Sequence, residues 1–166
     1  MDYGHWTTTL DKFYPEDWVG FTYLITGNLP NGKKIFYIGK KFFQSTTHKA
    51  VKGKKNKKKV VKESNWKTYS GSSKFLLSLL EAYGEDKFDF EILSLHESRS
   101  SLAYHEVFLI VSLNAMREKY PDGTKVFANG LLPTVRFSLK DDSENELKMR
   151  KDLNNIREQI TIDPQI

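Results

Sequence analysis

The pattern of apolar and polar residues predicts three strands in the first part of the chain. The segments FTYLI from Phe21 and IFYIG from Ile35 are rich in aromatic and β-branched residues, which favour strands. Residues 28–32, NLPNG, lie between them and tolerate tight turns, so residues 21–41 are predicted to form a β-hairpin. In residues 87–95, KFDFEILSL, apolar and acidic residues alternate, which predicts a half-buried third strand.

Apolar residues at helical spacing predict two helices around the third strand. Ser72 or Ser73 is a natural N-cap for the first helix, which Gly84 ends. The second helix is predicted from about Arg99 to Glu118. The apolar face of the first helix is expected to contain Phe75, Leu76, Leu79, Leu80 and Tyr83.

Glu106 interrupts an apolar stripe on the second predicted helix. The stripe contains Leu102, Leu109, Ile110 and Leu113, and Glu106 lies on the same face, one helical turn from Leu102 and from Ile110. A carboxylate that faces an apolar core is costly unless it is paired or binds a metal. The stripe therefore predicts a cation beside Glu106, either a divalent metal or one of the many lysines.

The residues after the second helix predict a turn, a short strand and a further helix. YPDG at 120–123 is the turn, and TKVFAN at 124–129 reads as a strand that ends at the turn signal Asn129-Gly130. A narrow apolar seam from about residue 142 to 160 predicts a charged C-terminal helix. This helix either docks on the domain or pairs with a second copy in a homodimer. The seam consists of Met149, Leu153, Ile156 and Ile160.

The composition indicates a small domain with charged extensions. Of the 166 residues, 39% are hydrophobic and 28% are charged, values that lie below and above those of an average globular protein. We divide the chain into an aromatic N-terminal extension at 1–18, a domain at 19–138 and a charged helical tail at 139–166. Without cysteine, disulfides and thiolate sites are excluded. No apolar run approaches the roughly 20 residues that span a bilayer, and no signal peptide follows Met1, so we expect a soluble, cytoplasmic protein without a membrane partner.

The net charge of +5 conceals a dense basic patch. Residues 40–67 contain eleven lysines and one acid, Glu63, a local charge of +10 that leaves −5 for the rest of the chain. Such a patch implies a polyanionic partner. Residues 51–62 have little that is apolar and are predicted to form a mobile loop or a frayed helix. Phosphate contacts are favoured over a merely solvated loop for Lys54, Lys55, Lys57, Lys58 and Lys59.

The stretch after the basic patch interleaves aromatic, hydroxyl and basic side chains. Trp66 and Tyr69 are candidates for stacking on bases. Ser73 and Lys74 stand at the predicted N-terminus of the first helix, where free amides suit a phosphate. The alternative is that the serine only caps the helix.

Each arm of the predicted hairpin carries a tyrosine in a nearly apolar setting, and this pattern resembles the GIY-YIG nuclease family. Tyr37-Ile38-Gly39 matches the second half of that signature, and Tyr23 keeps the tyrosine of the first half. The order of predicted elements over about residues 19–130 is similar too. The resemblance implies an α+β fold, with a small, mostly antiparallel three-stranded sheet flanked by helices, a C-terminal helical extension, and a nuclease of phage or homing-endonuclease type.

The resemblance also implies a mechanism. Glu106 matches the family's divalent-metal ligand, so Mg²⁺ (or Mn²⁺) is the expected cofactor and DNA the expected partner. Tyr23 would act as the general base or relay to it, with a pKa lowered by lysines and the metal, and Tyr37 would orient the water or the phosphate. Gly39 would let the strand approach the DNA backbone. Asn129 falls where family members carry an asparagine on the final element.

The chain departs from the family at one position. Members carry an arginine on the first helix after YIG that steadies the scissile phosphate, but no arginine precedes Arg99 here. A lysine supplies the charge without the planar fork. Lys41, or a lysine of the 54–59 cluster, is the expected replacement, and His48 is a candidate proton carrier or phosphate contact.

Three classes of function fit these features. A metal-dependent DNA endonuclease is favoured, because binding alone has no use for the Glu106 carboxylate in an apolar stripe. The alternatives are a non-catalytic nucleic-acid-binding protein with a lysine-rich loop and a small structural protein.

Overall fold

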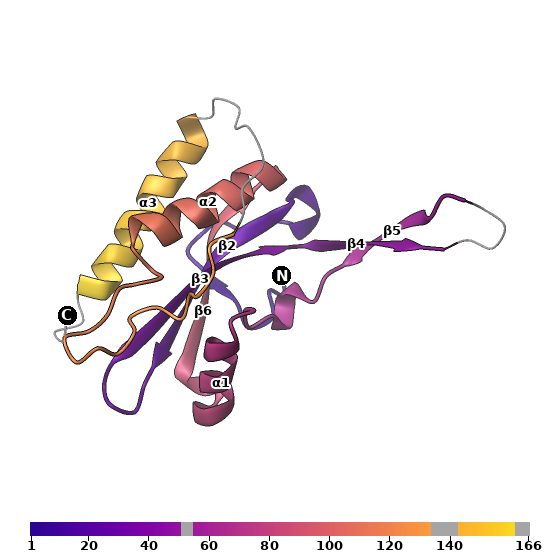
Figure 1. The fold of residues 1–166 in the computed structure, drawn as a ribbon. Helices are drawn as coiled ribbons and strands as arrows, with labels where there is room; N and C mark the ends of the chain where they lie inside the picture. The colour runs from indigo at the N-terminus through magenta and orange to yellow at the C-terminus, as the bar shows by residue number, and fades with distance from the viewer. Residues whose placement is uncertain (51–54, 134–142, 162–166) are drawn as a thin grey trace.

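A four-stranded sheet forms the centre of the fold (Figure 1), in the computed structural model that describes residues 1–50, 55–133 and 143–161. The strand order is β1-β6-β2-β3, and the strands are β1 at Thr7–Thr8, β2 at Gly20–Asn28, β3 at Lys34–Phe42 and β6 at Phe88–His96. β2 pairs antiparallel with β3 and β6, while β1 pairs parallel with β6. The mostly antiparallel α+β fold is thus confirmed. The count of three strands was wrong, because a two-residue strand such as β1 is too short to show a period.

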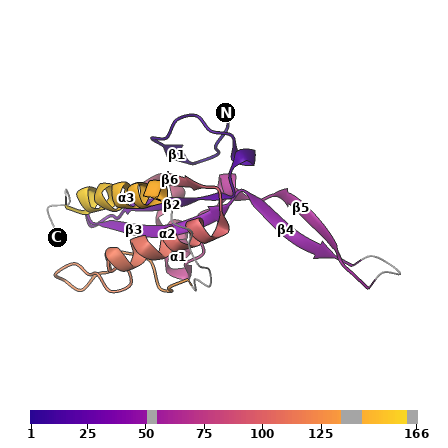
Figure 2. The ribbon, with the colours of Figure 1, turned by 90° about the horizontal axis from the view of Figure 1, so that it is seen from above.

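The sheet is covered on both faces because its strands alternate side chains between two cores. Tyr23, Ile25 and Tyr37 belong to one core, together with the N-terminal segment and α1 (Lys74–Tyr83). Leu24 and Phe36, from the intervening positions, belong to the other core, together with α2 (Arg99–Ser112) and α3 (Ser143–Thr161). Figures 1 and 2 both show α2 and α3 side by side.

The N-terminal segment is part of the first core and includes a short 3₁₀ helix at Pro15–Asp17. It covers the β6 edge of the sheet through β1. Trp6 and Phe13 are both buried. The Trp6 indole Nε1 donates to the backbone oxygen of Trp66, at 2.6 Å, so the N-terminal segment is joined to a residue far along the chain.

The basic region forms a two-stranded arm, β4 (Gln44–Lys49) and β5 (Lys58–Glu63), which projects away from the sheet (Figures 1 and 2). The prediction of a mobile loop or frayed helix for residues 51–62 was wrong for the part that lies in β5. The two strands pair antiparallel over six residues each. Backbone hydrogen bonds therefore hold the two strands together, although the sequence of the arm shows no alternation of apolar and polar residues that would predict strands.

Capping residues set the limits of α1 and α2. The Ser73 hydroxyl accepts from the backbone N–H of Leu76 at the start of α1, and Gly84, with φ +87°, follows its end. α2 ends at Ser112, earlier than predicted, and Asn114 shortly after it adopts a left-handed conformation with φ +49°. Two further 3₁₀ helices lie at Trp66–Thr68 and Glu85–Lys87.

The segment predicted as a strand at 124–129 makes only isolated bridges. Phe127 pairs in parallel with Phe36 on the free edge of β3. The Phe36 N–H donates to the Val126 oxygen at 2.9 Å, and the Ala128 N–H donates to the Phe36 oxygen at 2.7 Å. These bonds close the β3 edge without forming a continuous strand.

The C-terminal helix α3 docks on its own domain. Leu153 and Ile156 of the predicted seam are buried in the second core, and Ile160 packs against it. The alternative of a homodimer through this seam is therefore not supported, because Leu153 and Ile156 are already covered within the chain. None of the helices in the described part of the chain has the length and apolar character needed to cross a membrane.

Candidate active site

The two tyrosines of the hairpin face each other on one side of the sheet. Tyr23 on β2 is paired with Gly39 on β3, and Tyr37 is paired with Ile25, so the two tyrosines are diagonal neighbours. Their ring centroids lie 6.1 Å apart. Tyr69 adds a third phenol, with its ring edge-on to Tyr23 at 6.3 Å. Tyr23 is 1% exposed and Tyr37 8%, so the pair lies just beneath the surface.

Gly39 provides the space that the Tyr23 phenol occupies. A Cβ atom at Gly39 would lie 2.3 Å from the Tyr23 hydroxyl oxygen and 2.4 Å from Cζ, far inside ordinary contact. The Tyr23 ring therefore lies over the backbone of β3 at Gly39, a position that has no side chain. We expected this glycine to let the strand approach DNA, but the space above its Cα is filled by Tyr23.

A β-bulge accompanies Tyr23 on the other side of β2. The register of β2 with β6 shifts between Thr22, opposite Ser94, and Tyr23, opposite Ile92. A bulge bends the strand and changes the direction of a side chain, and bulges are frequent next to active sites. The bulge thus lies at Tyr23, where it affects the direction in which the phenol points toward Tyr37.

The loop before α1 supports Tyr37. The Tyr37 hydroxyl lies 3.4 Å from the Ser72 hydroxyl, at the long limit of a hydrogen bond. Gly71, with φ +90°, passes so close that an added Cβ would lie 3.1 Å from the Tyr37 ring. Tyr37 is consequently held between the strand and this loop.

The electrostatics of the pair differ from our expectation. Burial, assisted by the phenols of Tyr37 and Tyr69 and by the Glu106 carboxylate, raises the pKa of Tyr23 well above its usual value near 10. Burial also raises the pKa of Tyr37, although a hydrogen bond with Ser72 opposes the rise. The predicted lowering was wrong for the protein by itself, because burial disfavours the charged phenolate form. Both phenols are neutral at neutral pH.

Glu106 is buried on α2 and paired with a lysine from β3. It is 7% exposed, and its Oε2 accepts a hydrogen bond from Lys40 Nζ in an ion pair. Burial raises the pKa of Glu106, and the Lys40 ammonium opposes that rise. Because the Glu106 charge also acts on both Tyr23 and Tyr37, the carboxylate lies within electrostatic reach of the pair. The lysine partner foreseen as an alternative to a metal is therefore present.

Lys41 lies on the opposite side of β3 from Lys40, as expected for successive strand residues. Its Nζ donates to the Asn65 side-chain oxygen at 2.7 Å and lies 3.8 Å from the centroid of the Tyr69 ring. Burial lowers the pKa of Lys41. Through Tyr69 this ammonium joins the group around Tyr23, so Lys41 is the better placed of the two replacements considered for the family's arginine.

Asn129 extends the ladder at the free edge of β3. Its Oδ1 accepts from the Ile38 N–H at 3.0 Å, and its Nδ2 donates to the Ile38 oxygen at 2.8 Å. The side chain is 3% exposed. The structure thus gives Asn129 a positioning role beside the YIG strand.

The predicted nucleic-acid residues separate into three groups. Trp66 is 0% exposed, so its ring is part of the core and the prediction that it stacks on bases was wrong. Ser73 caps α1 and also donates to the Ala128 oxygen at 2.8 Å, which supports the capping alternative, while Lys74 beside it is exposed. The residues His48, Lys55, Lys57, Lys58 and Lys59 are exposed on or near the arm, and Lys54 lies outside the described residues.

The position of the arm separates its lysines from the tyrosine pair. Lys58 and Lys59 pair with Lys49 and His48 at the end of the arm away from the sheet, and Figure 1 shows that this end is remote from α1 and α2. The alternative that a lysine of the 54–59 cluster replaces the arginine is therefore not supported for the described members. His48 is equally remote from the pair.

A buried polar network was not foreseen from the sequence. His105 Nδ1 lies 3.1 Å from His96 Nε2, and His105 Nε2 lies 3.3 Å from Asp152 on α3. Asp152 also accepts from the Ser94 hydroxyl at 2.6 Å. Burial lowers the pKa of His96 to about 3 and that of His105 to about 2, and it raises the pKa of Asp152 to about 6. The network ties α3 to the helix that carries Glu106.

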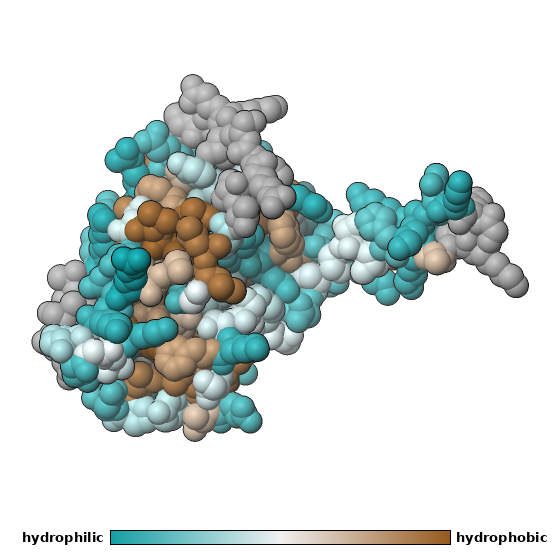
Figure 3. Space-filling model, viewed as in Figure 1, coloured by the Kyte–Doolittle hydropathy of each residue, from teal (hydrophilic) through white to brown (hydrophobic). Residues whose placement is uncertain are grey.

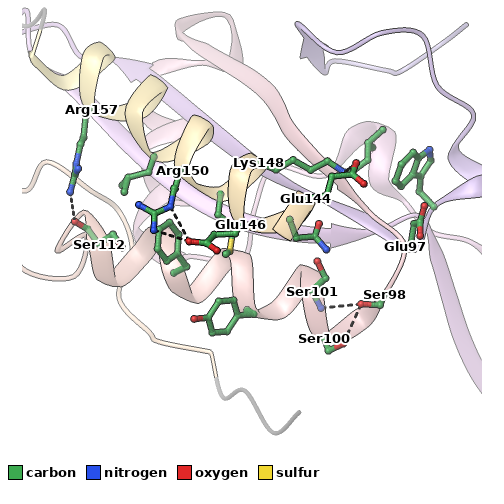
Figure 4. Close-up of a pocket in the computed structure, with 17 residues that line it drawn as sticks. Glu97, Ser98, Ser100, Ser101, Ser112, Glu144, Glu146, Lys148, Arg150 and Arg157 are labelled. Carbon is green, nitrogen blue, oxygen red and sulfur yellow. Dashed lines mark hydrogen bonds and ion pairs between the residues drawn. The ribbon is translucent and has the colours of Figure 1, made fainter. Parts of the chain in front are cut away.

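A pocket of about 950 Å³ lies between α2 and α3, away from the tyrosines. Figure 4 shows that several of its charged groups are engaged with their neighbours. Arg150 pairs with Glu146, and Arg157 donates to the Ser112 oxygen at 3.4 Å. Neither tyrosine of the pair nor Glu106 lines it, so we place the candidate active site at the tyrosines.

The donor set at the site is small. Within residues 1–50, 55–133 and 143–161, no three histidine, aspartate or glutamate side chains are grouped so as to hold a metal ion. Mg²⁺ is often bound through one or two carboxylates, with waters and substrate phosphates as further ligands. Glu106 by itself fits that kind of site when a phosphate is present.

Two tyrosines paired across a strand hairpin and a buried glutamate on α2 are the features in which this chain resembles the GIY-YIG nucleases. The family model described as "Putative endonuclease segE, GIY-YIG domain" matches residues 5–132. The chain belongs to this GIY-YIG nuclease family. The match begins inside the segment predicted as an N-terminal extension, in agreement with the burial of Trp6 and Phe13. No curated protein and no solved structure matches the chain.

Proposed function

We propose that this protein is a DNA endonuclease that hydrolyses phosphodiester bonds with the help of one divalent metal ion. The single observation that carries the proposal is the arrangement of Tyr23 across Gly39, opposite Tyr37 and within reach of the Glu106 charge. A core tyrosine needs neither a second phenol nor a buried carboxylate nearby. Membership of the GIY-YIG family supports the nuclease assignment.

Glu106 would hold the divalent ion, Mg²⁺ or Mn²⁺. The bound ion would neutralise charge on the scissile phosphate and lower the pKa of a bound water. In the free protein Lys40 pairs with the Glu106 carboxylate. A second cation on Glu106 would weaken that ion pair, which would leave the Lys40 ammonium available for a phosphoryl oxygen of the DNA.

The phenols would position and transfer protons. Tyr23 and Tyr37 are neutral in the free protein, because burial raises their pKa values. Positive charge brought close to Tyr23 would oppose this rise and favour loss of the phenol proton to solvent, and the resulting phenolate would accept a proton from the attacking water. Tyr37, closer to the surface, would orient that water or a phosphoryl oxygen, and Lys41 would supply positive charge beside Tyr69.

DNA would be bound through the basic surface. Lys55, Lys57 and Lys58 are exposed, and each phosphate contact by such a residue releases a condensed counterion. Lys74 at the start of α1 would add a contact beside the site. This surface would hold the duplex while the residues at β2, β3 and α2 act on one phosphate.

The test is single-turnover cleavage of a duplex plasmid, with and without Mg²⁺, by the wild type, three site variants and one control variant. Tyr23→Phe and Tyr37→Phe keep the rings and should each lower the rate by about 10² to 10⁴, the usual size of a lost general acid or base. Glu106→Gln should abolish cleavage while DNA binding persists. Tyr120→Phe is the control, because Tyr120 is equally buried but donates its hydroxyl to the Lys34 oxygen, at 2.7 Å.

Wild-type rates in both hairpin variants would refute the paired-tyrosine site, and an unchanged rate in Glu106→Gln would refute the role of the carboxylate. One observation favours a second candidate, a non-catalytic nucleic-acid-binding protein: Lys40 already satisfies Glu106 without a metal. Binding without any nicking by the wild type in Mg²⁺ or Mn²⁺ would support that candidate.

A further inference from the structure

The β4–β5 arm carries its positive charge on one face. Residues opposite each other in an antiparallel pair share a face, and successive residues alternate between faces. The register of the arm therefore defines a lysine face, which consists of Ser45, Thr47, Lys49, Lys58, Val60 and Lys62. It also defines a mixed face, which consists of Gln44, Thr46, His48, Lys59, Val61 and Glu63. The lysine face has three lysines and no acid, whereas on the mixed face one lysine is balanced by Glu63.

Neither face of the arm is covered by the described part of the protein. All twelve paired residues are exposed except Thr46 and Val60, which are half-buried. Figure 3 shows a mostly hydrophilic surface along the arm. Lys49 lies directly opposite Lys58, and like charges in that position destabilise a strand pair. An isolated two-stranded hairpin is marginal in water in any case, so this arm calls for a partner with dense negative charge.

We infer that the arm enters the major groove of duplex DNA as a two-stranded ribbon, with the lysine face toward the base edges and their flanking phosphates. This inference rests on the proposed function, which makes duplex DNA the substrate. The major groove, about 12 Å wide, admits a two-stranded ribbon, while the minor groove, about 6 Å wide, does not. Strands of six residues extend about 20 Å, roughly six base pairs.

The lysine face also has groups that can distinguish bases. Lys49, Lys58 and Lys62 suit the O6 and N7 acceptors of guanine, and Thr47 at the centre of the face offers a hydroxyl and a methyl group. RNA fits less well, because the major groove of an A-form helix is too deep and narrow for side chains to read. The arm would then select where the duplex is gripped, while the tyrosine pair acts on a phosphate some distance away.

The first test measures binding of the full chain to a short DNA duplex without divalent ions, so that cleavage plays no part. Lys58→Gln and Lys59→Gln change adjacent residues on opposite faces and are a matched pair. Lys58→Gln should reduce the steepness of the salt dependence by roughly 0.9, and Lys59→Gln by less than half of that. The triple change of Lys49, Lys58 and Lys62 to Gln should reduce it by roughly 2.7. Melting temperatures verify that the variants fold.

The second test locates the groove by methylation protection with dimethyl sulfate, which reacts with guanine N7 in the major groove and with adenine N3 in the minor groove. Guanine N7 should be protected by the wild type and by Lys59→Gln, and the protection should be lost in the triple variant. Thr47→Val should change which guanine-containing sites are preferred, while Thr46→Val, on the mixed face, should leave that preference unchanged.

Three results would overturn the inference: equal salt slopes for the two single variants, protection of adenine N3 instead of guanine N7, or equal or tighter binding to duplex RNA. The outcome is distinct from that of the proposed function. Nicking with no difference between the faces would reject the ribbon and keep the nuclease. Face-dependent binding without nicking would do the reverse.

Discussion

Replacing Gly39 with alanine should displace the Tyr23 phenol and reduce cleavage more than it reduces stability. The added Cβ would lie 2.3 Å from the Tyr23 hydroxyl oxygen, where ordinary contact begins at 3.4 Å. The phenol must therefore retreat by about 1.1 Å, the difference between these distances. Tyr23 is almost fully buried, with Trp6 at 5.0 Å and Tyr69 at 6.3 Å between ring centroids, so little free space is available for this movement.

The magnitude follows from the displacement. Forcing an extra methyl group into a packed core costs about 1 to 3 kcal/mol of unfolding free energy. A reacting group misplaced by about 1 Å lowers a rate by about 10²-fold. Gly130→Ala is the matched control, because a Cβ at Gly130 meets nothing within 4 Å. Single-turnover cleavage rates and urea unfolding would be measured for both variants.

A double-mutant cycle identifies the cause. Tyr23→Leu removes the hydroxyl, Cζ and Cε1 atoms that the new Cβ would meet, so in that background Gly39→Ala should cost almost no further stability. Tyr23→Phe would not serve, because Cζ remains. The reasoning fails if Gly39→Ala keeps wild-type rate and stability, or if its stability cost is the same with leucine at position 23.

The remaining predictions concern stability. Asn129→Ala removes both bonds to Ile38 in a buried setting, so urea unfolding should show a loss of about 2 to 3 kcal/mol; a loss below half a kcal/mol would contradict the positioning role. The pKa values of His96, about 3, and His105, about 2, lie below the 6.5 of the unfolded chain. Their contribution is therefore complete above pH 6.5 and is lost as the pH falls. The pKa of Asp152 is raised from 3.8 to about 6, so between these pH values the folded protein binds one proton at Asp152 that the unfolded chain does not bind. This proton offsets one of the two protons that the unfolded chain binds at the histidines. The contribution of these three groups to the unfolding free energy should thus fall by about 1.4 kcal/mol per unit from pH 6 to pH 4, and a flat profile in urea titrations would contradict the buried network.

The sequence predicts the parts of the fold that bury an apolar face. The hairpin predicted from Phe21 to Lys41 agrees closely with strands β2 and β3 of the structure, because two segments rich in aromatic and β-branched residues flank a strong turn signal. The stripe around Glu106 likewise located a buried carboxylate on α2. In both cases the pattern along the chain reflects burial, and burial is the strongest constraint on sequence.

The strands of the β4–β5 arm could not be predicted from the sequence, because none of their residues is buried. Its strands contain lysines, threonines and two valines without apolar alternation, so no period distinguishes them from a solvated loop. Trp66 was misassigned for a related reason: a tryptophan among lysines is compatible with stacking on bases, but Trp6 and Phe43 enclose it in the core. Which aromatic residues are covered depends on contacts between distant segments, which spacing along the chain does not show.

The pleat of β3 determines which side chain each of the two lysines of the site contacts. Lys40 and Lys41 follow one another, so they point to opposite faces, Lys40 to Glu106 on α2 and Lys41 to Tyr69 beside the pair. Because β3 is the last strand of the sheet, charges on both of its faces can meet at one edge. This explains how a glutamate from the helix on one face can act electrostatically on tyrosines of the other. A shift of one residue in the β2–β3 register would exchange the two lysines and separate Tyr23 from Gly39, so the register of a single hairpin determines whether the site exists.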